Sequence, residues 1–305
     1  MSIVERALQK ASALGRAAAN APAASPAKAD AGGAVRQTRR APAGKEGSPS
    51  SSAGRIELKP EALRAAGLAA PSNMDHTIAE ELRLIKRPLL LNAEASSAAP
   101  LINRNLVMIG SALPGAGKTF FSLNLAMSMA SELDWTVLLI DGDVTRPTLS
   151  RSLGLADAPG LINLLEQDAA GDVGTFAFET DLPRLRVLPA GPLRPNVKEL
   201  LGSQRMRSFV EDLAQQQRQI VILDSPPLLL TSEARVLASY AGQIVLVVEA
   251  GVTPRRSVLE AIETLDATKA VNLVLNKNRQ VLGIGEYQYA AYGADGRHTY
   301  GKTED

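Results

Sequence analysis

From residue 105 onward, short apolar runs rich in Val, Ile and Leu alternate with longer segments of helical character. Such apolar runs predict strands that are buried on both faces of a sheet, and the segments between them predict helices that cover it. The alternation therefore indicates one α/β domain with a mostly parallel sheet, extending over residues 56–283. The predicted strands are NLVMIG, TVLLID, LRVLPAG, QIVILD, QIVLVVEA and NLVLNK, and the predicted helices cover residues 118–133, 198–217, 233–239 and 255–268.

Both ends of the chain lack this alternation. Residues 1–55 start with apolar positions at helical spacing between Ile3 and Leu14, and then become rich in Ala, Pro, Ser and Gly. This composition cannot bury enough apolar surface to offset the entropy of ordering, so we expect a short helix followed by a disordered arm. The helix is expected to dock on a partner or on the domain. A membrane-surface anchor is the alternative, which its mostly Ala apolar face disfavours. Residues 284–305 are expected to form a flexible tail.

Charge and residue usage exclude several classes of protein. The net charge of +1 combines +6 over residues 1–70, from 11 Lys and Arg against 5 Asp and Glu, with −5 over the rest. An acidic domain with a short basic arm makes nucleic acid a poor partner. The absence of Cys excludes disulfides and thiolate nucleophiles, and the presence of only two His argues against a multi-histidine metal centre. No apolar run approaches the ~20 residues of a membrane-spanning helix, so we expect a soluble, cytoplasmic protein.

A glycine-rich turn joins the predicted strand NLVMIG to the helix that follows it. Its residues SALPGAGKT, at 111–119, match the P-loop pattern in the form that begins with Ala. The glycines let backbone N–H groups converge on phosphate oxygens, and the helix adds its positive N-terminal end. Lys118 would neutralise the phosphates and the Thr119 hydroxyl would ligate Mg²⁺. The predicted phosphate-binding residues are Pro114, Gly115, Ala116, Gly117, Lys118, Thr119 and Phe120.

Three aspartates follow two of the predicted strands. Asp224 ends QIVILD at the carboxyl edge of the sheet, where a Walker-B aspartate holds Mg²⁺. Asp141 and Asp143 follow TVLLI, and carboxylates at i and i+2 past a strand point the same way. Either could ligate Mg²⁺ or accept a proton from an incoming hydroxyl. A capped strand end or a solvated turn would have the same pattern, and the nearby P-loop favours the catalytic interpretation.

Together these motifs resemble those of the bacterial tyrosine kinases (BY-kinases) of exopolysaccharide and capsule export. The three phosphate motifs of that family correspond to SALPGAGKT, LLIDGDVTRP and VILDSPP, and its tyrosine-rich tail corresponds to GEYQYAAYG. The resemblance includes PGLINLLE at 159–166 and GPLRPNVKELLGSQRM at 191–206, and it covers about residues 78–292. Within the family the chain looks most similar to the autokinases encoded with exosortase and PEP-CTERM sorting loci. Members often carry two basic residues after the second Asp, whereas this chain has Thr145 and then Arg146.

The resemblance implies a P-loop NTPase three-layer sandwich of the ParA/MinD-like type. The implied activity is that of a protein-tyrosine autokinase that uses ATP and Mg²⁺ and regulates exopolysaccharide polymerisation and export. Asn276 would contact the adenine, and Arg146 would belong to the nucleotide site. The metal would be held by Thr119, Asp141 and Asp224, and catalysis would depend on Lys118, Asp141, Asp143 and Asp224.

The resemblance also implies partners. A helix bearing Glu80, Arg83 and Lys86 would contact the next subunit of a homo-oligomer, which could be a ring, and a solvated charged face is the alternative. The activator would be a separate inner-membrane chain-length-control protein that recruits the kinase peripherally to that membrane. A tyrosine phosphatase would be a further partner.

Tyrosines are concentrated at the end of the chain. The chain has 5 Tyr, and four of them lie in its last 21 residues: Tyr287, Tyr289, Tyr292 and Tyr300. Their Gly, Ala and polar neighbours offer little to bury an aromatic ring. A flexible tail that carries phenols beside a kinase site favours a role as the phosphate acceptor, and a merely adhesive tail is the alternative.

Two other classes remain compatible with the phosphate motifs. Positioning ATPases of the ParA/MinD type share this fold and hydrolyse ATP without phosphorylating protein. Their P-loop has an additional Lys in KGGxGK[ST]. This chain has Leu113 and Pro114 in the aligned region, so that Lys is absent. A regulatory or scaffold module that only binds ATP would carry the same motifs.

Overall fold

The computed structural model describes residues 53–69, 75–94, 102–167 and 172–278, and the structural statements below concern these residues. The expectations for the N-terminal helix, the basic arm and the four tail tyrosines fall outside the described residues, as does the end of the predicted domain at 279–283.

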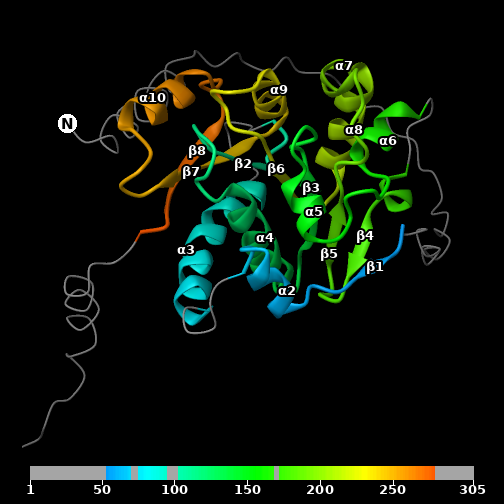
Figure 1. Ribbon diagram of the computed structural model, residues 1–305, viewed down its shortest axis with the longest axis horizontal. Helices are drawn as coiled ribbons and strands as arrows, with labels where there is room; N and C mark the ends of the chain where they lie inside the picture. The colour runs from blue at the N-terminus through cyan, green and yellow to red at the C-terminus, as the bar shows by residue number, and fades with distance from the viewer. Residues whose placement is uncertain (1–52, 70–74, 95–101, 168–171, 279–305) are drawn as a thin grey trace, which may run out of the picture. The chain divides into compact units, whose positions relative to one another are not determined.

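A sheet of eight strands forms the centre of the described region (Figure 1). The strands are β1 (Arg55–Ile56), β2 (Leu106–Gly110), β3 (Thr136–Asp141), β4 (Phe178–Thr180), β5 (Leu185–Leu188), β6 (Gln219–Asp224), β7 (Gln243–Glu249) and β8 (Ala270–Asn276). Their order is β1-β4-β5-β3-β6-β2-β7-β8, and only the β4–β5 pair is antiparallel. The mostly parallel sheet expected from the apolar runs is therefore confirmed.

The central strands are buried on both faces, because successive side chains of a strand point to opposite sides of the sheet. In β2, Leu106 and Met108 belong to one apolar cluster, and Val107 and Ile109 belong to the other. Every residue of β2 and of β6 is buried. These two clusters make the described region a three-layer sandwich, as the resemblance implied.

Two groups of helices cover the opposite faces of the sheet (Figure 1). The first group is α2 (Pro60–Ala65), α3 (Asp75–Glu94), α4 (Lys118–Ala130) and the short α5 (Thr148–Ser152). The second is α6 (Leu161–Glu166), α7 (Val197–Leu201), α8 (Gln204–Gln215), α9 (Ser232–Tyr240) and α10 (Arg255–Glu263). A 3₁₀ turn, η1, covers Val173–Thr175. Among the helices of the described residues, none combines the length and the apolar composition of a membrane-spanning segment.

The prediction of one helix over residues 198–217 is wrong. The segment forms α7 and α8, and the break between them falls at Gly202 and Ser203. Gly202 caps α7, and the Ser203 hydroxyl accepts a hydrogen bond from the Met206 N–H to cap α8. Glycine is a poor helix former and serine favours a helix start, so these two residues outweigh the continuous apolar pattern.

Candidate active site

The P-loop lies between two adjacent strands, β2 and β6, whose following helices cover opposite faces of the sheet. The connection after β2 runs through α4 on one face, whereas the connection after the adjacent β6 runs through α9 on the other. Ligands of open α/β sheets bind in the crevice at the carboxyl ends of such strands. This crevice is the place where the glycine-rich turn ends in α4 and where Asp224 ends β6.

Two glycines give the turn its shape. Gly115 and Gly117 have φ values of 87° and 89°, in the left-handed region that favours glycine. Gly117 is the N-cap of α4 and makes no side-chain cap hydrogen bond. A Cβ atom at Gly117 would lie 2.3 Å from Asn276 Nδ2, so a larger residue would clash there. Because no side chain caps the start of α4, its first N–H groups are available to an anion.

Lys118 is the cation of this turn. Within the described residues, no carboxylate forms an ion pair with its ammonium group. Burial lowers the pKa of Lys118, while the nearby charges of Asp224 and Asp143 raise it. A partly buried ammonium group with donors to spare suits a bound phosphate group, which would restore the interactions lost by leaving water.

Asp224 lies beneath the start of α4. One of its oxygens, Oδ1, accepts a hydrogen bond from Ser122 Oγ at 3.0 Å. Burial raises the pKa of Asp224 to about 6, while the nearby Thr119 hydroxyl and the Lys118 charge oppose the rise. The structure thus places Thr119 near Asp224. Ser122 was not singled out from the sequence, although it lies one helical turn after Lys118.

Asp141 is fully buried on β3, next to β6. Its Oδ2 atom accepts hydrogen bonds from the backbone N–H and the hydroxyl of Ser150, at 2.8 and 2.7 Å. The Ser150 hydroxyl also accepts the Ala190 N–H at 3.0 Å, which connects Asp141 to the end of β5. Burial raises the pKa of Asp141 to about 7, and the charge of Asp224 adds to the rise. No sequence motif identified Ser150, because this contact depends on the path of the chain after β3.

Asp143 is only half-buried. Its Oδ1 atom accepts hydrogen bonds from Thr145 Oγ1 and from the Arg146 backbone N–H, both at 3.1 Å. Burial raises the pKa of Asp143, while these hydrogen bonds and the Lys118 charge oppose the rise. Thr145 therefore orients this carboxylate. Arg146 itself is exposed to solvent.

The ends of β7 and β8 close the other side of the P-loop. Asn276 Nδ2 donates to Ala116 O at 2.8 Å, and Lys277 Nζ donates to Gly115 O at 2.6 Å. Lys277 Nζ also lies 3.1 Å from Glu249 Oε1. The sequence pointed to Asn276, whose contact with adenine stays a prediction. Lys277 and Glu249 were missed, although both stand at the carboxyl ends of predicted strands.

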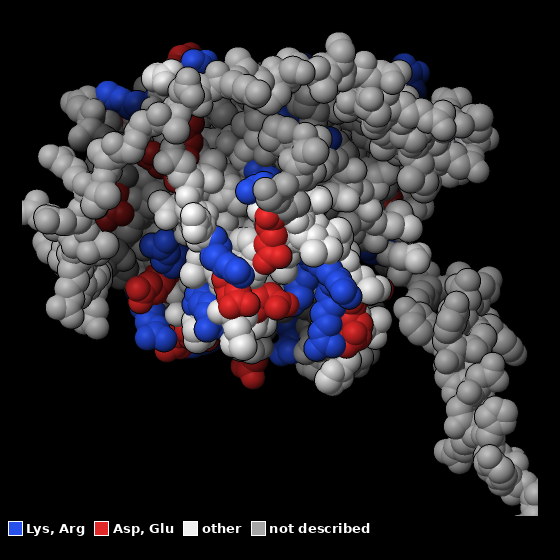
Figure 2. Space-filling model, turned by 180° about the vertical axis from the view of Figure 1, so that it is seen from behind, with Lys and Arg blue, Asp and Glu red and all other residues white. Residues whose placement is uncertain are grey.

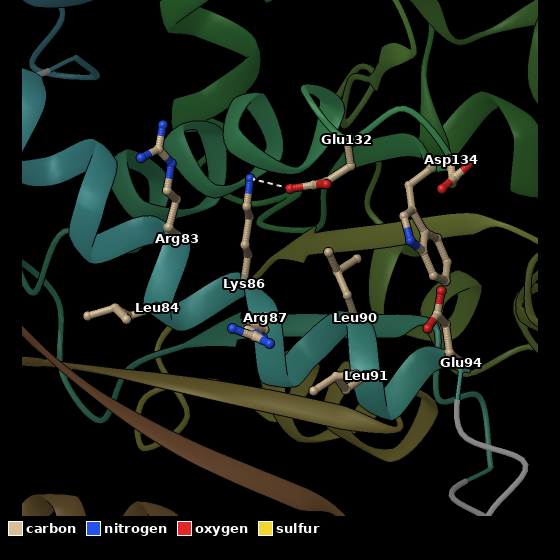
Figure 3. Close-up of a pocket in the computed structure, with 10 residues that line it drawn as sticks. Arg83, Leu84, Lys86, Arg87, Leu90, Leu91, Glu94, Glu132 and Asp134 are labelled. Carbon is tan, nitrogen blue, oxygen red and sulfur yellow. Dashed lines mark ion pairs between the residues drawn. The ribbon is translucent and has the colours of Figure 1, made fainter.

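The predicted subunit-contact residues behave in two ways, and Figure 3 draws two of them, Arg83 and Lys86. Glu80 and Arg83 form an exposed ion pair with each other on α3. Lys86 instead points to the end of α4, where its Nζ atom lies 2.7 Å from Glu132 Oε1 and donates to Ser128 O at 2.8 Å. The Lys86 side chain is only 11% exposed, so its contacts are made within the chain.

The donor set suits a magnesium–nucleotide complex. Among the described residues, no group of three or more acidic or histidine side chains could hold a metal ion unaided. The Thr119 hydroxyl and the Asp224 carboxylate lie near each other, and both are oxygen ligands of the kind that Mg²⁺ prefers. Because Mg²⁺ is usually bound by one or two carboxylates together with substrate phosphates, the residues present fit this metal.

A P-loop followed by a buried aspartate on the neighbouring strand defines the class of P-loop nucleotide-binding folds. No protein-family model matches the chain. The tyrosine-protein kinase YwqD of Bacillus subtilis is 34% identical over 184 residues, which cover 60% of this chain and 76% of that protein. The succinoglycan biosynthesis transport protein ExoP of Rhizobium meliloti is 32% identical over 202 residues, which cover 65% of this chain and 25% of that protein. The solved BceF tyrosine kinase domain has 25% identity and a TM-score of 0.56, and the match covers 73% of this chain and 92% of that domain.

The chain therefore belongs to the bacterial tyrosine-protein kinases, and it is an enzyme of that kind. The resemblance found in its phosphate motifs is confirmed. A kinase is therefore favoured over the two alternatives, a positioning ATPase and an ATP-binding scaffold. Membership of the exosortase-associated subtype stays a prediction.

Proposed function

We propose that the chain is an ATP- and Mg²⁺-dependent autokinase that phosphorylates tyrosines of its own C-terminal tail and thereby regulates exopolysaccharide polymerisation and export. The placement of Asp224 beneath the start of α4, bonded to Ser122 and near Thr119 and Lys118, carries the proposal, because it joins a phosphate cradle to a metal ligand set. The similarity to a succinoglycan biosynthesis transport protein supports the polysaccharide setting.

Each site residue has a proposed role. The backbone of residues 114–119 and Lys118 bind the phosphates, with Phe120 and Arg146 at the edge of the nucleotide site. Thr119, Asp224 and Asp141 would hold Mg²⁺, which supplies positive charge that stabilises the transferring phosphoryl group. Both hydrogen bonds to the Asp143 side chain end on Oδ1, which leaves Oδ2 for an incoming phenol. Asp143 is therefore the proposed general base, and its raised pKa suits that role.

The proposed acceptors are Tyr287, Tyr289, Tyr292 and Tyr300. Strand β8 ends at the same edge of the sheet as the P-loop, and Lys277, just after it, contacts Gly115. In the sequence, the first of these tyrosines follows Lys277 by 10 residues. Entry of the tail into the site of a neighbouring subunit would place each phenol beside Asp143.

Assembly through α3 is proposed for the exposed Glu80 and Arg83. Lys86 would have to leave Glu132 and Ser128 to join such a contact. The proposed partners are a membrane-bound chain-length-control protein, which brings the kinase to the inner membrane, and a tyrosine phosphatase. On the described part of the face in Figure 2, basic and acidic side chains intermingle, which supports the expectation that nucleic acid is not a partner.

Incubation with Mg-ATP followed by mass spectrometry of the tail tests the proposal. We expect phosphate on the tail tyrosines of the unmodified chain and none in the Lys118→Met variant, because that variant removes the cation of the cradle. Phosphotyrosine of equal extent in both proteins would refute the assigned site. A chain that binds Mg-ATP and never labels its tail would refute autophosphorylation while leaving nucleotide binding intact.

A further inference from the structure

Two consecutive residues at the end of β8 hold two consecutive carbonyl groups of the P-loop. Lys277 Nζ donates to Gly115 O, and Asn276 Nδ2 donates to Ala116 O, at 2.6 and 2.8 Å. These contacts join segments that are more than 150 residues apart in the chain, since Lys277 and Gly115 are 162 positions from each other. Nothing in the glycine-rich motif itself predicts them.

The direction of these hydrogen bonds determines where the next N–H groups point. In a trans peptide the C=O of one residue and the N–H of the next point to opposite sides. Donors that hold the carbonyls of Gly115 and Ala116 on the β8 side therefore turn the N–H groups of Ala116 and Gly117 to the opposite side. N–H groups of such a turn form the concave site that binds phosphate oxygens.

The lysine is itself held in place. Its ammonium group lies 3.1 Å from Glu249 Oε1 at the end of β7, and its backbone φ of 56° lies in the left-handed region, which is uncommon for a residue with a side chain. The Glu249 N–H donates to Thr253 Oγ1 at 3.0 Å, which fixes the end of β7 in turn. A strained backbone of this kind persists only where its surroundings determine it.

We propose that Lys277, held by Glu249, is a positioning residue that keeps the P-loop in its phosphate-binding conformation together with Asn276. The inference rests on the proposed nucleotide function, which it deepens. The lysine acts through the loop backbone, so its effect concerns the phosphates and is independent of the base of the nucleotide.

Calorimetric titration of the full chain tests this inference. The two ligands are Mg-ATP and Mg-tripolyphosphate, which has no base or sugar. We expect Lys277→Met to weaken both ligands by a similar factor of about tenfold, because one charge-assisted hydrogen bond that orders the loop is lost. Lys277→Arg keeps a cationic donor and should restore part of the affinity. Thermal unfolding without ligand verifies that each variant is folded.

Lys269→Met is the matched control. Lys269 precedes the opposite end of β8 and donates to Ser239 O at 2.8 Å, so it makes the same kind of contact far from the P-loop edge. The control should bind both ligands as the unmodified chain does. If Lys277→Met loses affinity for Mg-ATP alone, the lysine acts on the nucleoside and the inference is wrong; it is equally wrong if neither affinity changes. An unmodified chain that binds neither ligand would refute the nucleotide function, and the inference with it.

Discussion

Asp141 and Asp224 are register partners on the adjacent parallel strands β3 and β6, and both side chains are buried. Burial raises their pKa values to about 7 and about 6, and the charge of Asp224 adds to the rise at Asp141. Two ionised carboxylates so placed destabilise the fold unless cationic groups compensate them. The pair is therefore suited to a bound cation and costs stability in its absence.

The first prediction concerns stability against pH in the nucleotide-free chain. The folded-state pKa of Asp224 lies above its ordinary value of 3.8, so the folded state keeps a proton that the unfolded state releases. The contribution of Asp224 to the free energy of unfolding is fully present below pH 3.8 and is lost as the pH rises from there through about 6. Asp224→Asn should therefore stabilise the fold by about 1 kcal/mol more at pH 8 than at pH 5. Thermal unfolding at both pH values measures this, with the exposed Asp157→Asn as control. A gain that does not depend on pH would contradict the assigned ionisation.

A second prediction concerns Ser150. Ser150→Ala removes a donor to Asp141 and the acceptor of the buried Ala190 N–H. We expect a loss of about 1–3 kcal/mol of stability in urea unfolding, because a buried N–H is left without a partner. Ser131→Ala, whose exposed hydroxyl bonds only the Met127 carbonyl, should stay within about 0.5 kcal/mol of the unmodified chain. Similar losses in both variants would show that Ser150 has no special structural role.

A third prediction separates binding from chemistry. Asp143→Asn keeps an oxygen that can accept the Thr145 and Arg146 hydrogen bonds, but it removes the proposed base. Tail phosphorylation should fall by about 100-fold or more, while the dissociation constant for Mg-ATP changes much less. Quench-flow kinetics and calorimetry give the two quantities. If affinity falls as far as the rate does, Asp143 serves binding and another group is the base.

A fourth prediction separates the two halves of the charged face of α3. Glu80→Ala combined with Arg83→Ala should shift light-scattering masses toward the monomer at an unchanged melting temperature, because both side chains are exposed. Lys86→Met should instead lower stability by about 1 kcal/mol or more, because Glu132 and Ser128 lose their buried partner. An unchanged mass for the double variant would mean that this part of α3 is a solvated face.

A fifth prediction concerns the tail. Truncation after Gly285 should remove nearly all autophosphorylation and leave Mg-ATP binding intact. A Lys118→Met chain with its tail should be labelled when it is mixed with the truncated active chain, because the tail of one subunit would enter the site of another. Absence of label on the inactive chain would rule out transfer between subunits. Undiminished labelling of the truncated chain would show that the acceptors lie elsewhere.

The sequence by itself determined the features that depend on neighbouring residues. Apolar runs identified the strands of a mostly parallel sheet, and the spacing from Ala112 to Thr119 identified the P-loop, because a strand, a tight turn and a helix start must follow one another there. The same local logic placed Asp141 and Asp224 at strand ends. It failed between residues 198 and 217, where the caps at Gly202 and Ser203 interrupt a periodic pattern.

Only the tertiary structure decided which strand ends meet. The order β3-β6-β2-β7-β8 does not follow the order of the chain, so no local pattern brings Asp141 beside Asp224 or Lys277 onto Gly115. The same holds for Lys86, which belongs to a charged helical face in the sequence but lies against the end of α4. Hydrogen bonds and burial at these places depend on the packing of distant segments, and packing is a property of the whole sheet and its helices.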